Sequence, residues 1–230
     1  MPPTNISARV MEGFNALGNG LVGNGPMPLP TFWKDLHMRS ESYFNRLNIT
    51  NCNQTLTFFQ SSYSDYVTNL PQPGYIPGDH AMWLTSLAFT IQRGYQVDGT
   101  AEADGEPFQT DTDPSTVAAD MQAIIENGLV ELKIGSVIVA RRFGLHHFPA
   151  GGGVNAAVSV ANNTAAPTIN HIAMTTNGAP SQQNKHRFTP PQSIFPNDQI
   201  LLTVKWPFSR TLKDNYVIQA DIEGGVVSAR

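Results

Sequence analysis

Four segments of the chain alternate between apolar and polar residues, and this period of two constrains the fold more than any other feature. The segments are residues 82–92, 130–140, 199–206 and 215–223. Because successive side chains of a strand point to opposite faces, each segment predicts a strand with one buried face and one solvent-exposed face. Such alternation is typical of antiparallel sheets, since the strands of parallel sheets are buried on both faces.

The same alternation assigns individual side chains to the core. We expect Trp83 to share the buried face of the first segment with Leu87. In the second segment we expect a buried Ile138, and in the third a buried Trp206. Weaker strand signals bring the number of expected strands to about eight. They lie at residues 55–60, 141–147, 155–160 and 168–174.

A single helix is expected between the strands. Asp113 can cap it, Pro114 can begin it, and Gly128 can end it in the left-handed conformation. An apolar stripe at Val117, Met121, Ile124 and Ile125 connects these ends. One short inserted helix among antiparallel strands with long connections predicts an all-β fold: an antiparallel two-sheet β-sandwich of Greek-key or jelly-roll topology.

The first 50 residues differ in composition from the rest of the chain. Glycine and proline are concentrated in residues 1–31, which predicts an extended N-terminal arm. Residues 32–47 have a loose apolar pattern that fits either a docking helix or an irregular segment. We therefore divide the chain into an arm with a docking segment, residues 1–50, and a jelly-roll domain, residues 51–230.

Cysteine content and hydropathy exclude several classes of protein. Cys52 is the only cysteine, so we expect neither an intrachain disulfide nor a zinc site built on thiolates. The sequence has no apolar run of about 18 residues and no basic leader at its start. We therefore expect no membrane-spanning helix, no secretory signal and a cytosol-like compartment.

The charges are unevenly distributed along the chain. Five basic and 14 acidic residues lie within 1–132, whereas nine basic and four acidic residues lie within 133–230. The net charge of −4 argues against sequence-specific nucleic-acid binding, which requires clustered lysine and arginine. The asymmetry fits solvated loops of different sign, two charged faces, or complementary patches through which like subunits meet head to tail.

An acidic stretch without lysine or arginine lies at residues 98–113. Its carboxylates belong to Asp98, Glu102, Asp104, Glu106, Asp111 and Asp113. Oxygen clusters of this kind bind calcium, although the spacing does not follow the EF-hand pattern. A calcium site, a solvated loop and an acidic contact surface remain open as interpretations.

The sequence contains no convincing catalytic motif. A G-x-G-x-x-G pattern occurs at residues 18–23, but no strand precedes it and the prolines that follow prevent a helix. His146 and His147 are adjacent, so on a strand they would point to opposite faces and could not bind one metal ion together. We expect no catalytic site, no cofactor and no bound metal.

Three motifs, taken in order, resemble those of a known family. The first runs from Val-Thr-Asn-Leu to Pro-Gly-Tyr-Ile-Pro-Gly-Asp at residues 67–79, and the second is Phe-Pro-Ala-Gly-Gly-Gly-Val at 148–154. The third runs from Phe-Thr-Pro-Pro to Ile-Phe-Pro-Asn-Asp at 188–198. Over residues 55–210 the chain resembles the jelly-roll capsid (coat) proteins of tailless icosahedral bacteriophages, especially those of phages with an internal membrane.

The resemblance implies a structural virion protein that self-assembles as trimers or pentamers, with other virion proteins as partners and no enzymatic activity. It implies a location in the virion, and in the host cytoplasm before assembly. Major coat proteins of that lineage commonly hold two jelly rolls, whereas 230 residues leave room for one. A vertex protein, a minor shell protein and a small coat protein are therefore open alternatives, as is contact with an internal membrane.

Subunit contacts are expected at the acidic stretch, at a glycine run and at four basic positions. These residues are Asp98, Glu102, Asp104, Glu106, Asp111, Arg141, Arg142, Gly151, Gly152, Gly153, Lys185 and Arg187. Opposite charges would pair across such contacts. A carbohydrate- or receptor-binding module and a cupin-like metalloenzyme on the same fold are the alternative hypotheses.

Overall fold

The structure is a computed structural model of the chain, and it describes residues 36–78, 80–93, 114–149, 155–161, 170–176 and 185–229. These residues form two antiparallel sheets and one α-helix, which confirms the expected all-β architecture. The expected arm at residues 1–31 lies outside the described residues.

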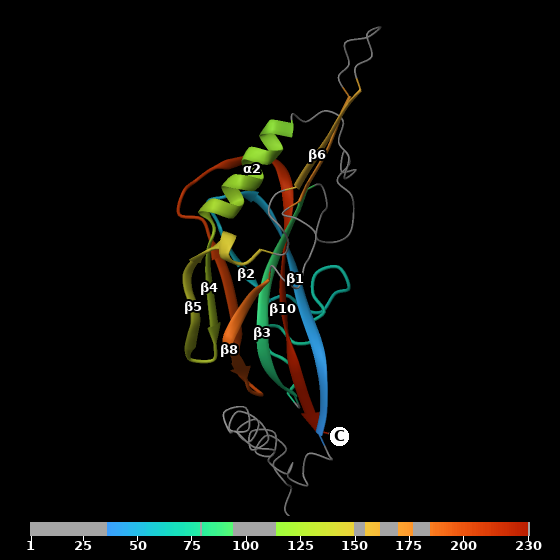
Figure 1. Ribbon diagram of the computed structural model, residues 1–230. Coiled ribbons are helices and arrows are strands. Elements are labelled where there is room, and N and C mark those ends of the chain that lie inside the picture. Colours follow the sequence, from blue (N-terminus) through green and yellow to red (C-terminus); the bar gives the residue numbers. More distant parts are fainter. Residues whose placement is uncertain are drawn as a thin grey trace, which may run out of the picture.

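Two sheets face each other in the described part of the chain (Figure 1). Sheet A has the strand order β1-β10-β3-β7-β6, with β8 also paired to β3, and sheet B has the order β2-β9-β4-β5. The strand bounds are β1 Leu36–Asn51, β2 Thr55–Phe58, β3 His80–Arg93, β4 Leu129–Ile134, β5 Val137–Gly144, β6 Asn155–Ala161, β7 Asn170–Thr176, β8 His186–Ile194, β9 Ile200–Lys205 and β10 Thr211–Ala229. Each of these strand pairs is antiparallel.

The core lies between the sheets, on the faces that the alternation indicates. In β9 the side chains of Ile200, Leu202 and Val204 are fully buried, and Trp206 just beyond the strand is buried as predicted. Phe58 of sheet B meets Phe89 of sheet A edge to face, with ring centroids 5.6 Å apart. Burial of each large apolar side chain contributes about 1.5–3 kcal/mol, so the facing apolar rows hold the sheets together.

The segment predicted as one strand over residues 130–140 is a hairpin. Strand β4 ends at Ile134 and β5 begins at Val137, so Gly135 and Ser136 form the turn. Gly135 has φ +56, which glycine adopts without steric cost. The prediction of a buried Ile138 is wrong because the turn falls inside the alternating run; its side chain is 46% exposed.

Strand β1 replaces the docking helix or irregular segment expected over residues 32–47. It pairs with β10, and Tyr43 and Ile49 face the core. Phe44 lies on the opposite face, where the Arg46 guanidinium is 5.0 Å from its ring centroid. This aromatic residue on the outer face interrupts the alternation, so the sequence pattern does not identify the strand.

Strand β8 was not predicted because Pro190 and Pro191 lie within it. In its register with β3, Arg187 lies opposite Ser86 and Gln192 lies opposite Leu84. The prolines fall between these positions and have no partner in the register. The sheet therefore requires no hydrogen bond from either proline, since proline has no backbone N–H to donate.

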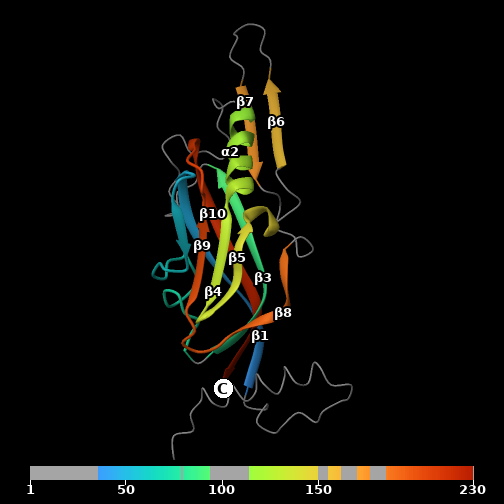
Figure 2. The same cartoon turned by 90° about the vertical axis from the view of Figure 1, so that its left-hand side faces the viewer.

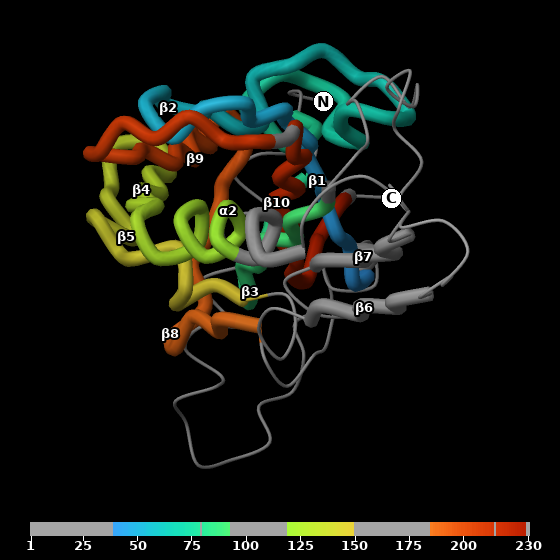
Figure 3. The backbone as a smooth tube through the Cα atoms, turned by 90° about the horizontal axis from the view of Figure 1, so that it is seen from above, coloured from blue at the N-terminus to red at the C-terminus, as the bar shows by residue number. Residues whose placement is uncertain are grey.

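Helix α2 spans Pro114–Asn127, close to the predicted bounds, and lies across one end of the sandwich (Figure 3). The β6–β7 hairpin extends beside it at the same end (Figure 2). Gly128 follows the helix but has no positive φ, so its predicted left-handed role is wrong. Packing favours glycine there, because a Cβ atom would make tight contacts, 3.0 Å from the Leu145 Cβ and from the Ile124 carbonyl oxygen. Asp113, the expected cap, lies outside the described residues.

Candidate functional site

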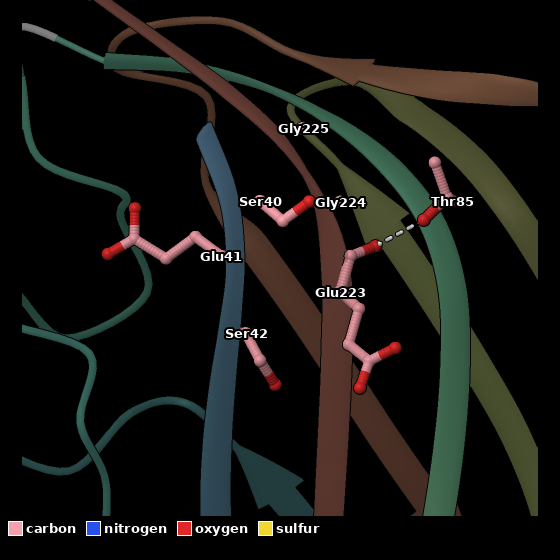
Figure 4. Close-up of a pocket in the computed structure, with 7 residues that line it drawn as sticks. All are labelled: Ser40, Glu41, Ser42, Thr85, Glu223, Gly224 and Gly225. Carbon is pink, nitrogen blue, oxygen red and sulfur yellow. Dashed lines mark hydrogen bonds between the residues drawn. The ribbon is translucent and has the colours of Figure 1, made fainter. Parts of the chain in front are cut away.

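A β-bulge at Thr85 shapes the outer face of sheet A. Glu223 lies opposite Ser86 and Gly224 lies opposite Leu84, so Thr85 has no partner on β10. The Thr85 hydroxyl instead donates to the Glu223 carbonyl oxygen at 3.0 Å (Figure 4). Bulges of this kind re-aim neighbouring side chains and are often found beside functional sites.

The bulge corrects the predicted position of Trp83. The extra residue reverses the alternation of β3, so Met82 and Leu84 face the core before it and Leu87 faces the core after it. Trp83 therefore lies on the outer face, where it packs against Ala81 and Val227. The expectation that Trp83 and Leu87 share one face is wrong because a bulge leaves no mark in an alternating pattern.

A partly open groove of about 390 Å³ lies beside this bulge. Seven residues from β1, β3 and β10 line it: Ser40, Glu41, Ser42, Thr85, Glu223, Gly224 and Gly225 (Figure 4). Hydroxyl groups, carboxylates and glycine backbone predominate. The lining can therefore exchange hydrogen bonds with a polar ligand.

The two groove carboxylates have cationic partners. The Arg39 guanidinium lies 3.1 Å from Glu41, and the Lys185 ammonium pairs with Glu223. Ser86 also donates to the Glu223 carboxylate at 3.2 Å. In Figure 4 the two carboxylate side chains point away from each other, so they do not form a convergent acid–base pair.

Histidine and phenylalanine rings connect the end of β5 with the start of β8. The Phe143 ring lies 6.2 Å from His147 and 6.3 Å from Phe148, and Phe148 lies 4.6 Å from His186. Burial lowers the pKa of His186, and the neighbouring charge of His147 lowers it further. No group of three or more histidine, cysteine, aspartate or glutamate side chains in the described part of the chain is arranged to hold a metal ion.

The predicted interface residues divide into three groups. Asp98, Glu102, Asp104, Glu106 and Asp111, together with Gly151, Gly152 and Gly153, lie outside the described residues. Lys185 is paired with Glu223. Arg141 and Arg142 are exposed on β5, and Arg187 is exposed on β8.

A buried carboxylate that sequence reasoning missed connects α2 to the start of β10. Asp120 is fully buried and accepts hydrogen bonds from the Arg210 guanidinium at 3.2 Å and from the Lys213 backbone N–H at 2.7 Å. Tyr216 donates a further bond at 3.3 Å. A signal was present, because Asp120 lies four residues before Ile124 on the apolar face of the helix.

The only cysteine of the chain lies near this carboxylate. Burial raises the pKa of Cys52 to about 11, and the negative charge of Asp120 raises it in addition. A thiol with such a pKa stays protonated at neutral pH and is a poor nucleophile. The arrangement is that of a structural anchor for α2 rather than a reactive centre.

Comparison with known protein families, with curated proteins and with solved structures finds no match for the chain. Among the described residues, α2 falls short of the length and apolar character needed to cross a membrane.

Proposed function

We propose that the chain is a single jelly-roll subunit of a virus shell and that it acts through contacts between subunits. The observation that carries the proposal is a nested strand pairing. Strand β1 pairs with β10, β2 with β9, β3 with β8 and β4 with β5. Such nesting is what a long hairpin produces when it wraps into the eight-stranded jelly roll of many viral capsid proteins, with β6 and β7 as an inserted hairpin.

The fold alone does not define a role, since lectins and cupins share it. The resemblance of residues 55–210 to phage coat proteins supports the structural role. The Thr-Asn pair of the first motif also has a clear structural use. Thr68 donates to the Phe44 carbonyl at 2.7 Å, and Asn69 accepts from the Phe44 N–H at 2.7 Å. This motif therefore covers the free edge of β1, which protects the sheet from unwanted strand addition.

The proposed subunit assembles as a trimer or pentamer with other virion proteins, in the host cytoplasm and then in the virion. It needs no cofactor and no catalytic site. Negative-stain electron microscopy of the purified chain at low and high ionic strength tests the proposal. Closed shells, rings or regular sheets at one of the two salt concentrations are expected. A field without ordered particles under both conditions would contradict it.

The groove on sheet A supports a second candidate function, the binding of a neutral carbohydrate. Its lining is rich in hydroxyl groups, and a Cβ atom on Gly225 would lie 3.8 Å from the Trp83 ring, so an aromatic residue borders the groove. A glycan array with the purified chain tests this function. Ser42→Phe, which fills the groove, is expected to abolish binding, whereas Asn48→Phe at an exposed position of the same strand should not.

A further inference from the structure

We propose that the exposed edge strand β5 is a docking surface for a second copy of this chain, bound through its acidic stretch at residues 98–113. This inference rests on the proposed self-assembly and identifies one of its contacts. The docking surface consists of Val137, Ile138, Arg141, Arg142 and Phe143.

Two bulges in β5 produce this surface. Ile138 lies opposite Lys133 and Ala140 lies opposite Leu132, so Val139 is an extra residue. A second register shift makes Arg142 extra, and this residue has φ +55, a conformation that arginine rarely adopts. The bulges break the alternation, so Arg141 and Arg142 are both exposed although they are adjacent.

The exposed side chains of β5 are apolar as well as basic. Val137 is 60% exposed, and Ile138 and Phe143 are each 46% exposed. Arginine and aromatic residues are enriched at the centres of protein interfaces, and large apolar residues gathered on one exposed strand mark contact sites. Neither arginine forms an ion pair with a described residue. Their charges are therefore available to an acidic partner.

The position of β5 favours contact through side chains rather than through strand addition. Strand β5 is the last strand of sheet B and pairs only with β4 among the described strands. Bulges in an edge strand disturb the row of N–H and C=O groups that another strand would need. A partner segment therefore contacts the arginine and apolar side chains and does not extend the sheet.

Charge complementarity identifies the occupant. The stretch 98–113 has six carboxylates and no basic residue, and Phe108 within it can contact the apolar part of the surface. A contact between the stretch of one copy and β5 of the next is head to tail, and such contacts close into rings when the rotation permits. Rings of this kind are the trimers or pentamers that the proposed function requires.

The test compares charge-reversal variants of the full chain by light scattering at low ionic strength. Arg141→Glu combined with Arg142→Glu is expected to weaken association by about a hundredfold, because like charges then face each other. Asp104→Lys combined with Glu106→Lys should do the same. The matched control is Lys205→Glu with Lys213→Glu, the same charge change at two exposed lysines away from the surface, and it should assemble as the wild type does. Val137→Glu provides a second disruption at a side chain that is 60% exposed.

Mixing the two charge-reversed proteins distinguishes the possible occupants. If the contact joins two copies, the mixture forms mixed pairs, because the unchanged stretch of the Arg141→Glu, Arg142→Glu protein meets the unchanged surface of the Asp104→Lys, Glu106→Lys protein. Rings of three or five copies do not close, because an odd ring places two copies of one variant side by side. A mixture that contains monomers alone would show that the stretch does not bind another copy and would overturn the inference. Wild-type assembly by the Arg141→Glu, Arg142→Glu and Val137→Glu variants would also overturn the proposed β5 contact. The proposed self-assembly would remain supported in that case. A monomeric wild type would overturn both proposals.

Discussion

Gly224 is a residue at which no side chain fits. A Cβ atom there would lie 1.8 Å from the Trp83 carbonyl oxygen, a backbone atom that cannot move without disturbing the β3–β10 ladder. We expect Gly224→Ala to lower the free energy of unfolding by about 2–3 kcal/mol or more, as other overpacked sites do. Urea denaturation measures the change.

The neighbouring glycine provides the control for this prediction. A Cβ atom on Gly225 would meet the Trp83 ring at 3.8 Å, an ordinary contact distance. Gly225→Ala should therefore change the free energy of unfolding by less than about 0.5 kcal/mol. Equal stability of the two variants would contradict the close approach that forms the bulge.

His186 makes stability depend on pH. Its folded pKa is lowered, chiefly by burial and then by His147, so the unfolded chain binds its proton more readily. The stabilising contribution is complete above the ordinary histidine pKa and is lost as the pH falls through the folded pKa. The urea midpoint of the wild type should fall between pH 7 and pH 5 by more than that of His186→Phe.

Two comparisons isolate this effect. Burial raises the pKa of Asp221, which stabilises the fold as the pH falls, but that contribution is the same in wild type and variant and cancels. His146→Gln changes an exposed histidine and should keep the wild-type pH dependence. Identical pH profiles for His186→Phe and the wild type would contradict the assignment.

At the scale of elements, Asp120 holds α2 against the sandwich. Asp120→Ala removes the acceptor of the Lys213 N–H and one hydrogen bond of the Tyr216 hydroxyl, and the loss of bonds to a buried carboxylate is costly. We expect the free energy of unfolding to fall by about 3 kcal/mol, measured by urea denaturation. Removal of the carboxylate also lowers the pKa of Cys52 from about 11, so the native thiol should react faster with an aromatic disulfide reagent.

Glu126→Ala is the matched control, because Glu126 lies on the same helix but is exposed. Its effect should stay within about 0.5 kcal/mol. If Asp120→Ala were equally mild, the carboxylate would not anchor the helix and another contact would have to do so. The Trp206 indole N–H, which donates to the Ile124 carbonyl at 2.9 Å, would be the next contact to test.

The elements that could be predicted are those in which buried residues recur at one regular interval along the sequence. Strand β9 and helix α2 each bury one regular face, so their patterns identify them. Strand β1 was missed because Phe44 lies on its outer face, and β8 because it carries two prolines. A bulge changes the face of a strand without changing its composition, and a turn inside an alternating run has the same effect. The positions of Trp83, beside a bulge, and of Ile138, after a turn, therefore could not be read from alternation.

At the scale of the whole molecule, the candidate sites depend on strands that are distant in sequence. The groove combines β1, β3 and β10, and the register that joins them is set by pairing over more than a hundred residues. Sequence reasoning proposed Arg141 and Arg142 as contact residues, but did not point to the apolar side chains exposed beside them. The two bulges that expose this set are a consequence of the β4–β5 pairing and have no local signature.

Self-assembly is the central claim of this account, and the mass of the purified chain in solution tests it most directly. Light scattering over a range of protein concentrations, at low and at high ionic strength, gives that mass. The account predicts discrete oligomers of three or five copies, or larger shells, whose abundance changes with salt because oppositely charged surfaces meet. A mass of 25.0 kDa at every concentration and salt would contradict it.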